Sequence, residues 1–158
     1  MAASLPRPQK MLHLALSLYA IALVFVVFWP AHVDDNAAGG ALVDFIDRGR
    51  AEGFLPGWVD YSSIEWLSNV VMFVPFGFLL FFVLPARLRF IAAVCGFCAS
   101  AFIESVQFFM PERTSSWWDI MANTLGALVG ALLAWVLNSL RTRVKKQHNP
   151  RKTQPRKG

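Results

Sequence analysis

Six charged or amide side chains stand close together in the stretch ESVQFFMPERTSSWWDIMAN, between two strongly apolar runs. They are Glu104, Gln107, Glu112, Arg113, Asp119 and Asn123. Carboxylates can serve as general acid and base, and arginine can grip a phosphate or carboxylate through two parallel hydrogen bonds. Amides can read sugar or peptide groups. These residue types fit recognition of a polar headgroup, or acid–base chemistry on one.

Helical spacing groups most of these side chains, with two earlier ones, into three pairs. Each pair has members three or four residues apart, which places them on one helix face: Glu65 with Asn69, Glu104 with Gln107, and Asp119 with Asn123. The helices that must carry the pairs follow from composition.

The 158 residues are 56% hydrophobic and only 16% charged, more apolar than a soluble domain. Four continuous apolar runs occur, at Met11–Trp29, Ile64–Leu84, Leu88–Phe109 and Trp118–Leu140. Each is near the roughly 20 residues that a helix needs to cross about 30 Å of hydrocarbon. Because the runs do not alternate, strands are a poor alternative. The sequence predicts an all-α integral membrane bundle of four transmembrane helices.

The first run, Met11–Trp29, is longer than the apolar core of a cleaved signal peptide, so we expect it to be retained as a span. Twelve of the 15 lysines and arginines then fall on the side of the two termini and three on the other. This asymmetry predicts cytoplasmic N- and C-termini.

Residues 1–140 are expected to form the four-helix domain, with 30–63 as its long, acidic outer loop and a short helix at Ala41–Glu52 within that loop. Residues 141–158 carry eight basic residues and no acid, and we expect them to be disordered. Because this tail follows a span directly and lacks interleaved aromatics, it indicates contact with anionic lipid and not with nucleic acid.

In this arrangement all three polar pairs lie within roughly 10 Å of the outer boundary. The short link Met110–Trp117 makes the third and fourth spans antiparallel neighbours, and Arg113 lies in that link. Ionisable groups inside a membrane are functional candidates by default. The competing reading is structural: Arg113 and Asp119 would staple a hairpin while the amides hold helices together.

Other residues have structural roles in this prediction. Pro75 should kink the second span, with Gly77 two residues later. Ala122, Gly126, Gly130 and Ala134 form a small-residue stripe that would let the fourth span pack closely.

The sequence lacks the residue patterns typical of redox cysteine pairs, zinc sites and nucleotide-binding sites. Cys95 and Cys98 lie inside the third span and are expected to be packing residues. His13, His32 and His148 have no zinc spacing, and no nucleotide-binding loop is present. We therefore predict no cofactor and no metal.

Three pieces together resemble the VanZ-like family of bacterial membrane proteins: NVVMFVPFGFLL at Asn69–Leu80, IESVQFFMPER at Ile103–Arg113 and DIMANTLGALVG at Asp119–Gly130. The resemblance covers roughly Glu65–Leu140. The positions characteristic of the family correspond here to Asn69, Pro75, Phe76, Gly77, Glu104, Gln107, Arg113, Asp119, Asn123 and Gly126. It implies a protein of the bacterial cytoplasmic membrane that serves the cell envelope, and the family's namesake is linked to teicoplanin resistance.

Three functions remain open at this point. In the first, an outer-leaflet pocket binds a lipid headgroup, a lipid-linked wall precursor or a glycopeptide. Its ligand-binding residues would be Glu65, Asn69, Glu104, Gln107, Arg113, Asp119 and Asn123.

In the second, an intramembrane enzyme transfers or hydrolyses a group on a lipid-linked envelope substrate, with Glu104 and Asp119 as acid and base. A variant of it would bind a divalent cation between Glu104, Asp119 and Glu65. The third, transport, lacks polar residues in the inner halves of the spans and would require a homo-oligomer.

Overall fold

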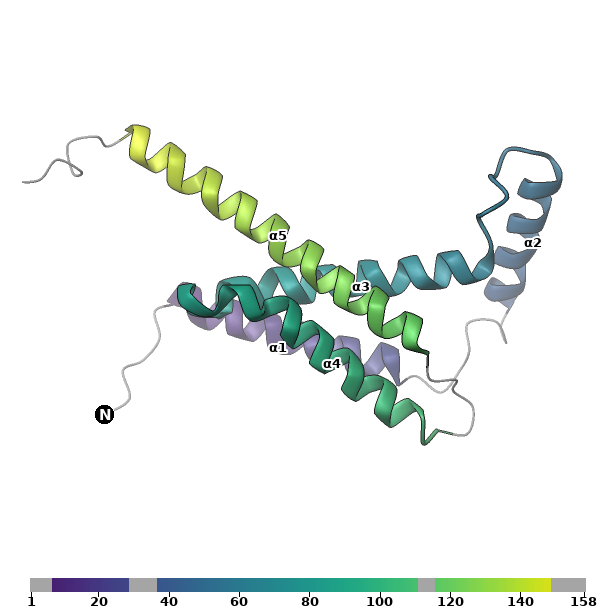
Figure 1. The fold of residues 1–158 in the computed structure, drawn as a ribbon, viewed down its shortest axis with the longest axis horizontal. Coiled ribbons are helices and arrows are strands. Elements are labelled where there is room, and N and C mark those ends of the chain that lie inside the picture. Colours follow the sequence, from purple (N-terminus) through teal and green to yellow (C-terminus); the bar gives the residue numbers. More distant parts are fainter. Residues whose placement is uncertain (1–6, 29–36, 111–115, 149–158) are drawn as a thin grey trace, which may run out of the picture.

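The computed structural model describes residues 7–28, 37–110 and 116–148. It contains five α-helices and one short 3-10 helix in these ranges, and no strand. In chain order they are α1 (Arg7–Val27), α2 (Ala37–Ala51), α3 (Tyr61–Val83), η2 (Ala86–Ile91), α4 (Ala92–Gln107) and α5 (Trp117–His148). Figure 1 shows α1, α3, α4 and α5 gathered in one bundle, with α2 beyond one end of it.

Four stretches are long and apolar enough to cross a membrane: Pro8–Val27, Tyr61–Val83, Ala86–Gln107 and Trp117–Val144. They coincide with the four predicted spans within a few residues, so the all-α class and the four apolar helices are confirmed. The third span is composite, because its first turn is the 3-10 helix η2 that follows Pro85.

The bundle has two distinct ends. At the loop end, α1 and α4 finish and α3 and α5 begin, whereas at the termini end α1 begins and α5 finishes (Figure 1). The loop end also carries α2, which closely matches the short helix expected at Ala41–Glu52. The chain returns from α2 through a turn in which the Leu55 amide bonds the Gly49 carbonyl at 2.9 Å. Asp60 then caps α3 by accepting the Ser63 N–H.

The helix α5 packs most extensively against α3 and next against α4, while α1 packs on α3. Small residues make the α3–α5 approach close. A methyl group added at Gly126 would overlap the Val70 carbonyl oxygen, and one at Gly130 would overlap that of Val74. In the reverse direction, one at Gly77 of α3 would meet the Ala127 carbonyl. The two backbones therefore touch where the sequence offers glycine.

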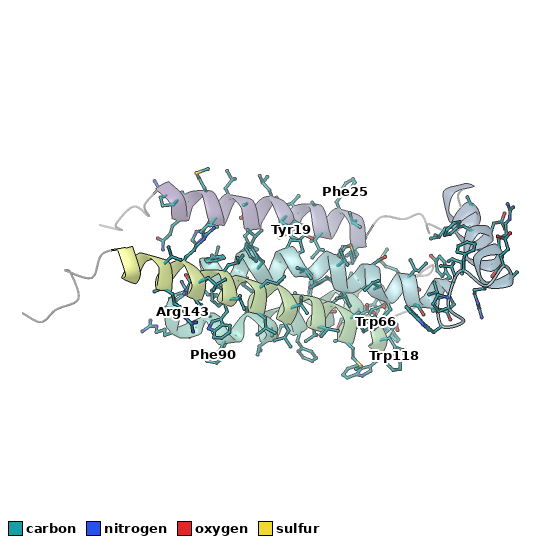
Figure 2. The ribbon with its side chains drawn as sticks, turned by 90° about the horizontal axis from the view of Figure 1, so that it is seen from above. Tyr19, Phe25, Trp66, Phe90, Trp118 and Arg143 are labelled. Carbon is teal, nitrogen blue, oxygen red and sulfur yellow. The ribbon has the colours of Figure 1, made fainter. Side chains whose placement is uncertain are left out.

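The apolar core is small and lies between these helices. It consists of Leu23, Phe73, Ile103 and Ala127. Tyr19 of α1 turns towards the bundle and donates its hydroxyl hydrogen to the Met72 carbonyl of α3, whereas Phe25 points away (Figure 2). Pro75 lies one turn from this carbonyl, inside α3, which continues past it to Val83.

At the termini end α5 continues past Leu140 to His148. Residues 141–148, which we expected to be disordered, are therefore helical. Residues 141–148 continue the helix without a break, and none of them is a helix breaker such as glycine or proline.

Candidate functional site

Buried polar side chains are concentrated on the facing surfaces of α4 and α5. Ser100, Glu104, Gln107 and Asn123 are all buried, with Glu104 only 4% exposed. The three on α4 recur at intervals of four and three residues, so they share one face of the helix. Such groups are costly to bury unless each finds a hydrogen-bond partner.

Glu104 closes the loop end between α4 and α5. Its Oε2 accepts the backbone N–H of Ser116 at 2.8 Å, immediately before α5 begins. Its backbone carbonyl accepts the Phe108 N–H at 2.9 Å, where α4 ends. The Glu104 side chain thus links the last turns of α4 to the residue that precedes α5.

Asn123 and Ser100 form the deepest of these contacts. The Asn123 Nδ2 donates to the Ser100 Oγ at 2.9 Å, and both residues are buried. The Asn123 Oδ1 is also buried and has no hydrogen-bond partner among the described residues. An amide oxygen in this state is a site at which one additional donor would be favourable.

Asp119 and Asn69 join α5 to α3. The Asn69 Nδ2 donates to the Asp119 Oδ1 at 2.9 Å. Asp119 stands in the first turn of α5, where the unsatisfied N–H groups of the helix favour a negative charge. The first turn of α5 is therefore bonded to α3 through Asp119 and to α4 through Ser116.

Gln107 reaches the end of α1. Its Nε2 donates to the Val27 carbonyl at 3.2 Å, one of the last carbonyls of that helix, which have no partner within it. With this bond, polar side chains of α3, α4 and α5 tie all four long helices together at the loop end.

The predicted site residues therefore fall into three groups. Five of them, Asn69, Glu104, Gln107, Asp119 and Asn123, lie in interhelical hydrogen bonds at the loop end. Glu65 is exposed at the start of α3 and is not part of the buried set. Arg113 and Glu112 lie outside the described residues, so the expected Arg113–Asp119 staple also lies outside them.

Three participants were missing from the prediction: Ser100, the backbone of Ser116 and Tyr19. Ser100 had a readable signal, because it lies four residues before Glu104 and therefore on the same face of α4. A backbone N–H and a tyrosine 53 residues from its acceptor have no comparable signal in sequence.

Both carboxylates considered for catalysis already accept a hydrogen bond within this chain. Asp119 accepts one from the side-chain amide of Asn69, and Glu104 accepts one from the backbone N–H of Ser116. The described residues contain no group of three or more histidine, cysteine or acidic side chains placed to hold a metal ion. Glu104, Asp119 and Glu65, which the divalent-cation variant would use, do not form such a group.

Tryptophans lie at the same end of the bundle. Trp117 and Trp118 are each 66% exposed at the start of α5, and the half-buried Trp66 lies at this end too (Figure 2). Indole rings favour the headgroup level of a membrane. A shallow depression elsewhere, on α1, is lined by Ala20, Ile21, Val24 and Phe25 and is wholly apolar. It belongs to the lipid-facing surface and not to the polar site.

A bundle of four long apolar helices, exposing large hydrophobic side chains along its flanks and joining its helices by polar bonds at one end, defines a multi-pass α-helical membrane protein. The chain belongs to the VanZ/LLP1 family, whose family model matches residues 16–138. That match confirms the resemblance and extends it to the first span. Comparison with curated proteins and with solved structures yields no significant match.

Proposed function

We propose that this protein is a binding protein of the bacterial cell envelope, which takes a polar headgroup at the loop end of its bundle. The ligand class is a lipid headgroup, a lipid-linked wall precursor or a lipophilic glycopeptide. The protein lies in the cytoplasmic membrane with both termini in the cytoplasm, so the loop end faces outward. Supporting this orientation, twelve of the 15 lysines and arginines belong to the termini side.

The observation that carries the proposal is the position of Glu104. Its carboxylate is buried, yet it is bonded to the Ser116 N–H at the foot of segment 111–115. Fixing both ends of a short segment lowers the entropy lost when that segment binds a ligand. Because the segment contains Arg113, it would present a guanidinium to a phosphate or carboxylate at the membrane surface.

The tryptophans support the same ligand class. Trp117 and Trp118 adjoin the segment and are exposed, so they can stack on rings or lie among headgroups. A headgroup with a charged centre and a sugar or aromatic portion would meet both kinds of side chain.

The test is direct binding to the full-length protein in nanodiscs. Fluorescently labelled teicoplanin and a labelled lipid-linked wall precursor serve as separate probes. Arg113→Ala should weaken binding of the cognate probe more than tenfold, and Arg113→Lys less. Arg48→Ala, which removes an exposed arginine of α2, is the control and should leave binding unchanged. If both Arg113 variants bind both probes as the natural protein does, the proposal fails.

A further inference from the structure

The termini end of the bundle is strongly basic and has no acidic counterpart in its own chain. Arginines at this end include Arg87 and Arg89 in η2, and Arg141 and Arg143 in α5. Among the described helices, no aspartate or glutamate occurs in α1 or η2, in α3 after Glu65, in α4 before Glu104, or in α5 after Asp119. Compensation of these charges must therefore come from outside the chain.

Arg89 differs from its neighbours because the protein holds its side chain in place. The guanidinium carbon lies 4.8 Å from the centroid of the Phe81 ring, and Phe81 is itself buried. A cation above an aromatic face is attracted by the ring electrons. The Arg89 Nε is buried and has no hydrogen-bond partner among the described residues. The guanidinium is thus oriented, partly desolvated and short of an acceptor.

The surroundings of Arg89 add to its preference for an anion. It precedes the first turn of α4, which has no acidic residue and whose N-cap, Ile91, makes no side-chain capping bond. Although η2 leads directly into α4 and the Ala92 N–H bonds the Arg89 carbonyl, the dipole of the combined helix still favours a negative group near its beginning. The exposed Arg87 is two residues away and can contribute a second cation.

Apolar neighbours identify the source of the anion. Phe90, next to Arg89, is 78% exposed and lies at the same end as Arg143 (Figure 2). Exposed apolar residues of the candidate span itself, such as Val94 and Phe97, follow on α4. An anion that meets the arginines while its apolar portion covers these side chains is a lipid with a charged headgroup.

We propose that the η2 turn binds the phosphate of an anionic membrane lipid, with Arg89 as the principal contact and Arg87 as the second. A guanidinium is suited to this role because its planar donors match the geometry of two phosphate oxygens. This site lies at the opposite end of the bundle from the headgroup site proposed above and does not depend on it.

The test is native mass spectrometry of the full-length protein released from nanodiscs that contain phosphatidylcholine and increasing fractions of phosphatidylglycerol. The natural protein should retain phosphatidylglycerol in preference to phosphatidylcholine. Arg89→Gln should lower the apparent affinity for phosphatidylglycerol roughly fivefold, the effect of one basic residue near a charged lipid surface. Arg89→Lys keeps the charge but loses the planar donors, and should fall between the two.

Two controls make the outcome specific. Arg48→Gln removes an arginine at the loop end, where Asp44 already faces it at 3.9 Å, and should change nothing. Inorganic phosphate at matched ionic strength should not displace the lipid. Equal retention of both lipids, an unchanged affinity in a folded Arg89→Gln protein, or displacement by inorganic phosphate would each overturn the assignment.

Discussion

At the scale of single residues, the polar side chains of the loop end act chiefly on one another. Asn69, Asp119, Asn123 and Gln107 each bond a different helix from their own. Their convergence was partly predictable, since polar side chains near the same end of neighbouring helices can meet when the helices pack, although Glu65 is exposed. Their partners were not, because helix rotation and crossing decide which pair forms. The structure therefore shows that these residues hold the helices together. A ligand site at the loop end would be built on helices positioned by these bonds.

The Asn69–Asp119 bond should contribute measurably to stability. Interhelical hydrogen bonds in membrane proteins average about 0.6 kcal/mol and reach about 1.7 kcal/mol. We expect a coupling free energy in that range from a double-mutant cycle of Asn69→Ala and Asp119→Ala. The measurement is reversible unfolding in mixed micelles. Coupling within error of zero would show that the bond contributes nothing to stability.

The cap of α3 should respond to acid. Asp60 accepts both the Ser63 hydroxyl and the Ser63 N–H, and these bonds hold the pKa of its carboxyl below the ordinary value. A lowered folded pKa means that the cap stabilises the helix above the ordinary pKa and ceases to do so as pH falls through the lowered one. Hydrogen exchange at the first turn of α3 should therefore accelerate, relative to the intrinsic rate, only at acidic pH.

Asp60→Asn keeps an acceptor without a titrating group, so its α3 should show no such acid dependence. If the natural protein and Asp60→Asn lose protection at the same pH, the carboxylate of Asp60 is not the responsible group.

At the scale of elements, glycine placement determines how α3 and α5 meet. Gly126 and Gly130 of α5 rest on carbonyl oxygens of α3, and Gly77 of α3 rests on a carbonyl of α5. The spacing of Gly126 and Gly130 suggested close packing, but not against which helix. For Gly77 the sequence suggested a structural role beside the expected kink at Pro75, but not its contact with a carbonyl of α5.

Substitution at this contact should separate the two helices. Gly126→Ala must displace the Val70 carbonyl, and we expect a loss of about 1–3 kcal/mol, the usual cost of overpacking. Gly126→Val should cost more. Gly40→Ala is the matched control, since a methyl group there meets no atom within 4 Å. Thermal unfolding in detergent is the readout, and equal stability of Gly126→Ala and Gly40→Ala would contradict the packing.

At the scale of the whole molecule, hydropathy was sufficient to predict the four helices that are long and apolar enough to span a membrane. Hydropathy averages over about 20 residues, and it therefore survives errors at individual positions. It cannot locate the ends of helices, which depend on single residues and backbone geometry. This explains why η2 was merged into the third span and why the helix through 141–148 was missed.

The proposed topology can be tested with single cysteines. In a Cys95→Ala, Cys98→Ala background, Gly57→Cys should react with a membrane-impermeant maleimide in intact cells. Thr142→Cys should react only after the membrane is permeabilised. The opposite pattern would invert the protein and place the loop end in the cytoplasm, where an external glycopeptide cannot reach it.

The length of α5 has a consequence for the membrane in which it sits. Its candidate span, Trp117–Val144, which ends beyond Arg141 and Arg143, has 28 residues and is therefore about 42 Å long, against roughly 30 Å of hydrocarbon. It crosses α3 obliquely in Figure 1, and leaning of this kind shortens its projection. In a thicker bilayer the helix would stand more upright, pivoting on its glycine contacts with α3. The tilt of α5, and with it the position of its first turn, would then depend on the thickness of the bilayer.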